Sequence, residues 1–154
     1  MAFDIASTLE TVHNHLAASG YFSGGVQVGE YMEPPDAVAN KLAGSIYMQS
    51  SQVAMIMTDG ATRELHVVVV RIYADLKDPT ESPEKKLAQG VSQVSSDMLG
   101  DADLGETIMA IDAGGAYGTN FGVAWGRVDI SQRMYRVADV TLPLIVDGSA
   151  TVTS

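Results

Sequence analysis

Residues 65–73 read LHVVVVRIY, a run in which β-branched and apolar side chains fall on both alternating faces. Such a strand is stable where both of its faces are covered, which is typical of the middle of a sheet. We therefore expect a central strand here and arrange the remaining elements around it.

Two other segments have the spacing of amphipathic helices. Apolar residues recur every three or four positions over residues 3–19 and 87–99, and a glycine follows each segment. The second helix is expected to begin at Ser82, Pro83 and Glu84. These residues supply a capping hydroxyl, a proline at the first helical position and an acid near the positive end of the helix dipole.

The remaining apolar runs predict strands and short helical turns. They are an extended piece at 26–28, one or two helical turns over 36–42, a hairpin or one long bent strand over 45–57, and strands over 107–111, 123–130 and 134–146. The last two strands form a hairpin through a turn at 131–133. Because Pro143 has no N–H to donate, we expect it at a sheet edge or a bulge.

This order of elements predicts an α+β fold, with a single mixed or mostly antiparallel sheet and two main helices packed on one face. One domain is expected over residues 1–147, followed by a short polar C-terminal tail over 148–154.

Composition excludes several classes of function. The 154 residues include nine Lys plus Arg and nineteen Asp plus Glu, for a net charge of −10, and no cysteine. Disulfides, thiolate metal sites and cysteine nucleophiles are therefore excluded. The negative charge disfavours tight binding to nucleic-acid phosphates, although it lets DNA slide past without sticking. No apolar stretch reaches the ~20 residues of a membrane span and no signal pattern opens the chain, so we expect a cytosolic origin.

The histidines do not form a catalytic or metal-binding pattern. His13 and His15 are two positions apart and point to different sides of the predicted helix. His66 lies on the predicted central strand, where a satisfied core or interface histidine is expected.

Two loops resemble ligand sites only in part. Residues 101–105 carry two aspartates and a glycine, but the glycine comes one position early for a calcium loop and no glutamate closes it. The glycine-rich loop over 113–122 has neither a Lys-Ser or Lys-Thr pair nor a following helix, as a phosphate cradle requires. We expect no catalytic residue, no metal and no cofactor. Met48, Met55 and Met57 are expected either to fill the core or to line a contact surface.

Several segments, taken in order, resemble the lambda-type tail terminators of siphophages, especially those of phages with actinobacterial hosts. They are VRIY at 70–73, GDADLG at 100–105, GAYG at 115–118, MYRV at 134–137 and VTLPLIVD at 140–147. The resemblance covers most of the chain from Gly29 onward. The chain departs from the family pattern at Glu106, where a second glycine is expected.

The resemblance implies a non-enzymatic structural protein of the virion, assembled in the host cytoplasm. Such subunits form a homo-hexameric ring on the head-proximal end of the tail tube, stop tube polymerisation and offer a docking face to neck or head-completion proteins. Genomic DNA passes through the ring without specific binding, and no membrane is involved.

Exposed loops at 75–82 and 112–122 are the expected places for partner contacts or bore lining, and Trp125 lies close by in the sequence. The candidate residues are Asp75, Lys77, Asp78, Glu81, Tyr117, Asn120, Phe121 and Trp125. Two alternatives remain. One is another neck or tail component, such as a head-completion or tube protein. The other, less favoured, is a small-ligand-binding domain or enzyme that uses the glycine-rich loop.

Overall fold

The structure of the protein is a computed structural model. It describes residues 5–19, 22, 25–29, 31, 42–56, 58–75, 82–100, 110–112 and 114–149. The elements are α1 (Ile5–Ser19), β1 (Val26–Val28), β2 (Ala43–Ile56), β3 (Ala61–Asp75), α2 (Pro83–Gly100), β4 (Ala110–Ile111), β5 (Gly122–Ile130) and β6 (Arg133–Ser149).

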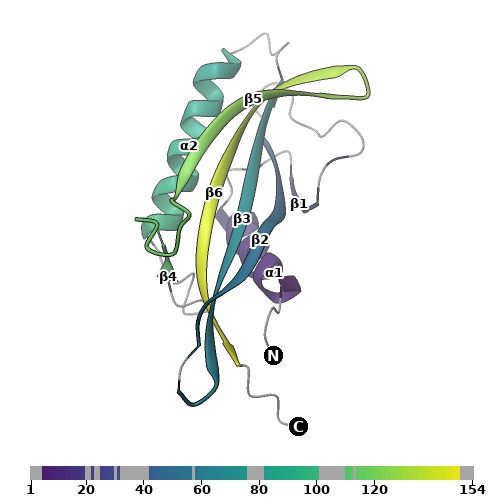
Figure 1. The fold of residues 1–154 in the computed structure, drawn as a ribbon. Helices are drawn as coiled ribbons and strands as arrows, with labels where there is room; N and C mark the ends of the chain where they lie inside the picture. Colours follow the sequence, from purple (N-terminus) through teal and green to yellow (C-terminus); the bar gives the residue numbers. More distant parts are fainter. Residues whose placement is uncertain are drawn as a thin grey trace.

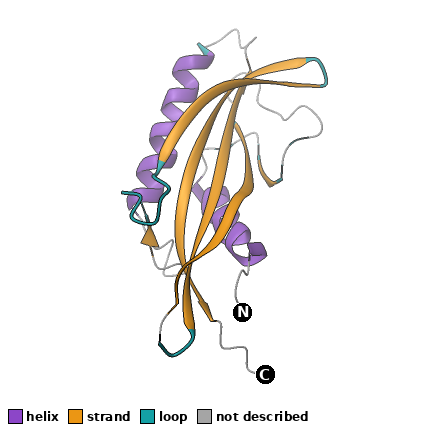
Figure 2. Cartoon of the chain, viewed as in Figure 1, coloured by secondary structure: helices purple, strands orange, loops and turns teal. Residues whose placement is uncertain are grey.

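The strands form one mixed sheet in the order β1-β2-β3-β6-β4, with β5 also paired to β6 (Figures 1 and 2). Only the β1–β2 pair is parallel among these strands. The strand β3 is hydrogen-bonded along its length to β2 on one edge and to β6 on the other. The predicted α+β fold and the predicted central strand are both confirmed.

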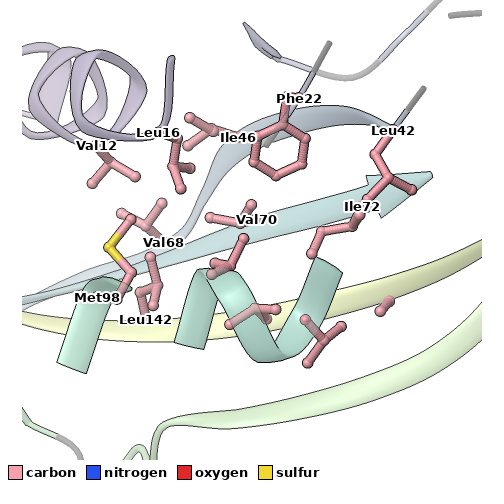
Figure 3. Packing of buried hydrophobic residues seen from close by; sticks show 14 of the residues in the cluster. Val12, Leu16, Phe22, Leu42, Ile46, Val68, Val70, Ile72, Met98 and Leu142 are labelled. Atoms are coloured by element: carbon pink, nitrogen blue, oxygen red, sulfur yellow. The ribbon is translucent and has the colours of Figure 1, made fainter. Parts of the chain in front are cut away.

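Both helices pack on one face of this sheet. Val68, Val70 and Ile72 of β3 lie on that face, and the register pairs Val68 with Leu142 and Val70 with Val140 of β6. The helices cover these side chains with apolar residues spaced at helical intervals, which are Val12 and Leu16 of α1 and Leu87, Val91, Val94 and Met98 of α2 (Figure 3). The apolar stripe of each helix and the alternate apolar residues of the strands therefore pack together in a single core.

The opposite face of the sheet carries a second, aromatic cluster. The Tyr73 ring lies edge-on to Tyr31 and to Tyr135, with ring centroids 5.3 and 5.9 Å apart. The Tyr73 hydroxyl lies 3.0 Å from the Ser45 hydroxyl, which gives the buried phenol a polar partner. Burial, together with neighbouring Tyr73, raises the pKa of Tyr31 to about 12. This cluster buries Tyr73, one of the residues of β3 on the face opposite the helices.

The segment predicted as either a hairpin or a bent strand is one long strand, β2. Its pairing with β3 shifts register between Met48 and Ser50 and again between Val53 and Met55. Each shift places one extra residue in β2, which bends the strand and increases its twist. Polar residues in the middle of the run therefore mark a bulge and not a turn.

β6 is not an edge strand, so the prediction of an edge for Pro143 is wrong, but the ladder on one side of β6 is interrupted at this residue. Its carbonyl accepts a hydrogen bond from the Asp112 N–H at 2.8 Å, on the side of β6 that faces β4 and β5. The nitrogen of a strand residue points to the same side as its carbonyl. β5 pairs with β6 up to Thr141 and β4 pairs from Leu144, so the missing N–H faces the gap between two partner strands.

Other boundaries differ slightly from the predicted ones. The turn of the β5–β6 hairpin contains two residues, Ser131 and Gln132, both with positive φ, while Arg133 already pairs with Ile130. β6 continues to Ser149, two residues into the predicted tail. Residues 107–109 of the predicted fourth strand and 36–41 of the predicted helical turns lie outside the described residues.

Two leucines of α2 provide a matched test of the packing. Leu87 is fully buried beneath the helix, whereas Leu99 is largely exposed. We expect Leu87→Ala to lower the free energy of unfolding by about 2–5 kcal/mol. Leu99→Ala should change it by about 0.5 kcal/mol or less. Urea denaturation measures both values, and equal losses would contradict the assigned helix orientation.

Candidate functional site

The most enzyme-like arrangement in the structure is a hydroxyl, an imidazole and a carboxylate in series. The Thr8 hydroxyl lies 2.8 Å from His66 Nδ1, and His66 Nε2 lies 2.8 Å from Glu64 Oε1. At such distances a histidine can activate a nucleophile while a carboxylate orients the histidine. The arrangement therefore has to be judged by its accessibility.

Its burial indicates a structural role. Thr8, His66 and Glu64 are only 4%, 0% and 1% exposed, at the junction of α1 with β3. A substrate has no route to the hydroxyl while the helix is in place. The Thr62 hydroxyl also donates to Glu64, so these polar groups satisfy one another inside the fold. The prediction of a satisfied buried histidine at position 66 is confirmed.

The two histidines of α1 contact different neighbours, as their spacing predicts. His13 Nε2 lies 3.1 Å from the Val26 carbonyl of β1. His15 Nε2 lies 3.0 Å from an Asp97 oxygen of α2, a contact that becomes an ion pair when the imidazole is protonated. Among the residues that the structure describes, no group of three His, Cys, Asp or Glu side chains is placed to hold a metal ion.

The glycine-rich loop is folded around an internal anion. The two carboxylate oxygens of Asp112 accept hydrogen bonds from the backbone N–H groups of Ala116 and Tyr117, at 2.9 and 3.0 Å. The Asp112 carbonyl accepts a third, from Gly115. The N–H groups of Ala116 and Tyr117 thus face a carboxylate of the chain itself, in the manner in which such groups elsewhere hold a phosphate. Two donors of the loop, the N–H groups of Ala116 and Tyr117, therefore have an acceptor within the chain.

Gly115 is required by this loop for two reasons. Its φ of +72° lies in the left-handed region, and a Cβ there would lie 1.7 Å from the Asn120 side-chain oxygen. Neither condition suits any other residue type. Asn120 therefore lies directly against the loop backbone, although much of its side chain is exposed.

The structure does not place Asp75, a candidate contact residue of the predicted loop at 75–82, in an exposed loop. Asp75 is the last residue of β3, not a loop residue, and its side chain is buried. Arg133 of β6 binds it, with Nε 3.1 Å from Asp75 Oδ2. The exposure expected for Asp75 is therefore wrong, because the strand is longer than its apolar run. Lys77, Asp78 and Glu81 lie outside the described residues.

The candidates of the second loop lie at another level of the sheet. Tyr117 is half-buried, and Phe121 packs against the main core. Trp125 of β5 is 44% exposed and offers a large apolar surface. Asp75 pairs with Tyr135 of β6, which in turn pairs with Val128 of β5. The glycine-rich loop ends at Gly122, the first residue of β5, which is six residues from Val128 along that strand. Since a strand rises ~3.3 Å per residue, Asp75 and the glycine-rich loop do not form one site.

The structure has an exposed apolar tip, at which only Met55 was a candidate for a contact surface on the basis of the sequence. Val53, Met55 and Ile56 stand near the turn between β2 and β3, which projects from one end of the molecule (Figure 1). Ile56 alone is 73% exposed. The apolar run at 53–57 predicted a strand, but the pattern alone did not indicate that this strand extends beyond the helices. Met48 is half-buried against the core, Met55 is exposed, and Met57 lies outside the described residues.

Comparison with known proteins gives no further guide to this surface. The sequence matches no protein-family model, and no characterised protein is significantly similar to it. Neither described helix has the length and apolar character that crossing a membrane would demand.

The anion at the centre of the glycine-rich loop can be removed. Asp112→Ala leaves two backbone donors without their acceptor, so we expect a loss of about 1–3 kcal/mol in unfolding free energy. Faster amide hydrogen exchange at Ala116 and Tyr117 should accompany it. Asp129→Ala, an exposed acid on β5, is the matched control. Unchanged exchange at both amides would refute the assigned role of Asp112.

The buried series at the α1 junction yields another prediction. His66→Leu deprives the Glu64 carboxylate of its imidazole partner, and we expect this to cost about 3–5 kcal/mol. The double variant Glu64→Leu/His66→Leu removes both polar groups together and should recover most of that loss. Thermal and urea unfolding measure both variants. A double variant no more stable than the single one would contradict the pairing.

Proposed function

We propose that this chain is a structural subunit of a phage tail, a terminator that forms a hexameric ring on the head-proximal end of the tail tube. The ring stops tube polymerisation and provides the docking face for neck or head-completion proteins. The proposal rests on the ordered resemblance of segments 70–73, 100–105, 115–118 and 134–147 to that family. Two features of the fold support it.

The first feature, and the one that carries most weight, is a sheet with a partly unpaired strand at each side. Within the described residues, β2 pairs with β1 only over Gly44–Ile46 and has no other neighbour on that edge. On the far side, β5 pairs with β6 alone. Unpaired strand edges are ready sites for contact with another chain. Two different edges on opposite sides suit a head-to-tail contact, which closes into a ring when its rotation allows.

The second feature is the apolar tip of Val53, Met55 and Ile56. Each of these exposed apolar side chains gains free energy when another molecule covers it. The tip lies at one end of the sheet, away from the β5–β6 turn at the other end (Figure 1). A subunit with two dissimilar ends suits a ring that must bind the tube on one side and a neck protein on the other.

The negative net charge of the chain is compatible with a ring through which DNA passes. With a net charge of −10, the subunit repels the phosphate backbone of DNA. DNA can then pass through a ring of such subunits without adhering to it, because attraction to phosphates is what makes basic proteins bind.

The nearest rival is another tail component, such as a tube subunit or a head-completion protein, with the same small fold and the same kind of contacts. Polymer length separates them. A tube subunit assembles into long tubes by itself, because each new ring templates the next. A terminator stops at a single ring or stays monomeric until it meets a tube.

Deletion of the encoding gene tests the proposal directly. We expect electron microscopy of particles from the deleted phage to show tails of uncontrolled, excess length and no joined heads. Complementation with the intact chain should restore tails of normal length and joined heads. The Ile56→Asp variant should restore neither, because a charge at the tip opposes its burial against another protein. Tails of normal length in the deleted phage would refute the terminator role. The folded state of Ile56→Asp is checked by its thermal unfolding.

A further inference from the structure

Two arginines lie side by side on the β5–β6 hairpin. Arg127 and Arg136 are directly opposite each other in the register. Like charges in this position destabilise a strand pair. In a chain with only nine Lys plus Arg and a net charge of −10, such a pairing needs a physical reason.

Glu84 supplies part of that reason. From the first turn of α2, its carboxylate accepts hydrogen bonds from Arg136 Nε at 3.0 Å and from the second guanidinium nitrogen at 3.1 Å. These bonds, with the charges of Arg136 and Arg127, lower the pKa of the Glu84 carboxyl. Arg136 also donates to the Gly126 carbonyl at 3.0 Å, which fixes its guanidinium plane. The pair is a fork-to-fork contact, the geometry that arginine prefers with carboxylates.

Among the described side chains that line this site, positive charges outnumber negative ones by one. Two guanidinium groups and one carboxylate line the pocket, and no side-chain hydrogen bond joins the exposed guanidinium of Arg127 to a described residue. The other acid on this face of β5 is Asp129, two residues from Arg127 and outside the pocket lining. Ser82 and Pro83 complete an open pocket of about 370 Å³ around the three charged side chains. If one further anion bound to Arg127, two negative charges would face the two arginines of the pocket.

Apolar side chains stand next to this pocket on the same face. Trp125 is two residues from Arg127 on β5, and Met134 is two residues from Arg136 on β6, so each shares its neighbour's face. They are 44% and 40% exposed. Trp, Met and Arg are the residues enriched where proteins contact one another, and Trp and Arg often dominate the binding energy.

We propose that this arginine pocket, formed by Arg127, Arg136 and Glu84, binds the carboxylate of an Asp or Glu side chain on a neighbouring protein, whose adjacent apolar residues pack on Trp125 and Met134. Glu84 already demonstrates that the pocket accepts a carboxylate. A nucleic acid is disfavoured, because the net charge of −10 repels a polyanion over its whole length. A single carboxylate beside apolar residues meets no such barrier. This inference is independent of the terminator role.

Trp125 is the only tryptophan in the chain and therefore reports on this surface alone. The full chain is titrated with the peptide acetyl-Leu-Glu-Leu-amide and with its Gln counterpart while tryptophan emission is recorded. Inorganic phosphate and a short DNA duplex are titrated at the same ionic strength. Arg127→Gln tests the pocket, and Lys85→Gln removes an equal charge from an exposed residue of the same helical turn outside it.

We expect saturable binding of the Glu peptide, with the Gln peptide and the Arg127→Gln variant each weaker by about tenfold or more. Lys85→Gln should bind within about twofold of the unaltered chain. Thermal unfolding verifies that both variants fold. The proposal is overturned by equal affinity for the two peptides, by tighter binding of phosphate or duplex, by an unaffected Arg127→Gln variant, or by no binding at about 10 mM peptide.

Discussion

The fold depends on the two-sided pairing of β3. Buried backbone N–H and C=O groups must find partners, and β3 finds them in β2 on one edge and in β6 on the other. Once those three strands are in register, the alternate side chains of β3 from Val68 to Ala74 present an apolar face. Both helices bury that face, and the tyrosine cluster covers part of the reverse side. Each remaining element is placed by its contact with these strands.

Two polar arrangements inside this framework find their hydrogen-bond partners within the chain. Thr8, His66 and Glu64 have the spacing of a catalytic series, yet they connect α1 to the sheet. The carboxylate of Asp112 likewise accepts two backbone N–H groups that, in another protein, would suit a phosphate. In both places the chemistry of the residue types is used for stability. Residue pattern alone does not separate such arrangements from working sites, because accessibility is a tertiary property.

The surface divides into parts with different physical character. One end carries exposed aliphatic side chains near Ile56, and the opposite hairpin carries Trp125 beside two arginines. Most of the remaining charge is acidic. Contact with other proteins suits this distribution better than contact with nucleic acid, because uncovered apolar area and a localised positive charge both gain from a complementary partner. The terminator proposal and the arginine-pocket proposal use separate parts of this surface.

The sequence alone determined the elements whose cause is local: the apolar run at 65–73 marks a buried strand, and Pro83 with its neighbours marks a helix start. Of the predicted contact residues, it placed Trp125 on a strand but could not tell that its ring is exposed. Only the tertiary structure showed that the side chains of Ile56 and Trp125 are exposed. It also showed that Arg127 and Arg136 are opposite each other on paired strands. That opposition follows from a two-residue turn where the sequence had suggested three residues. Local pattern fixes periodicity and turn chemistry, whereas burial and register depend on segments distant in the chain, and only the folded arrangement brings those together.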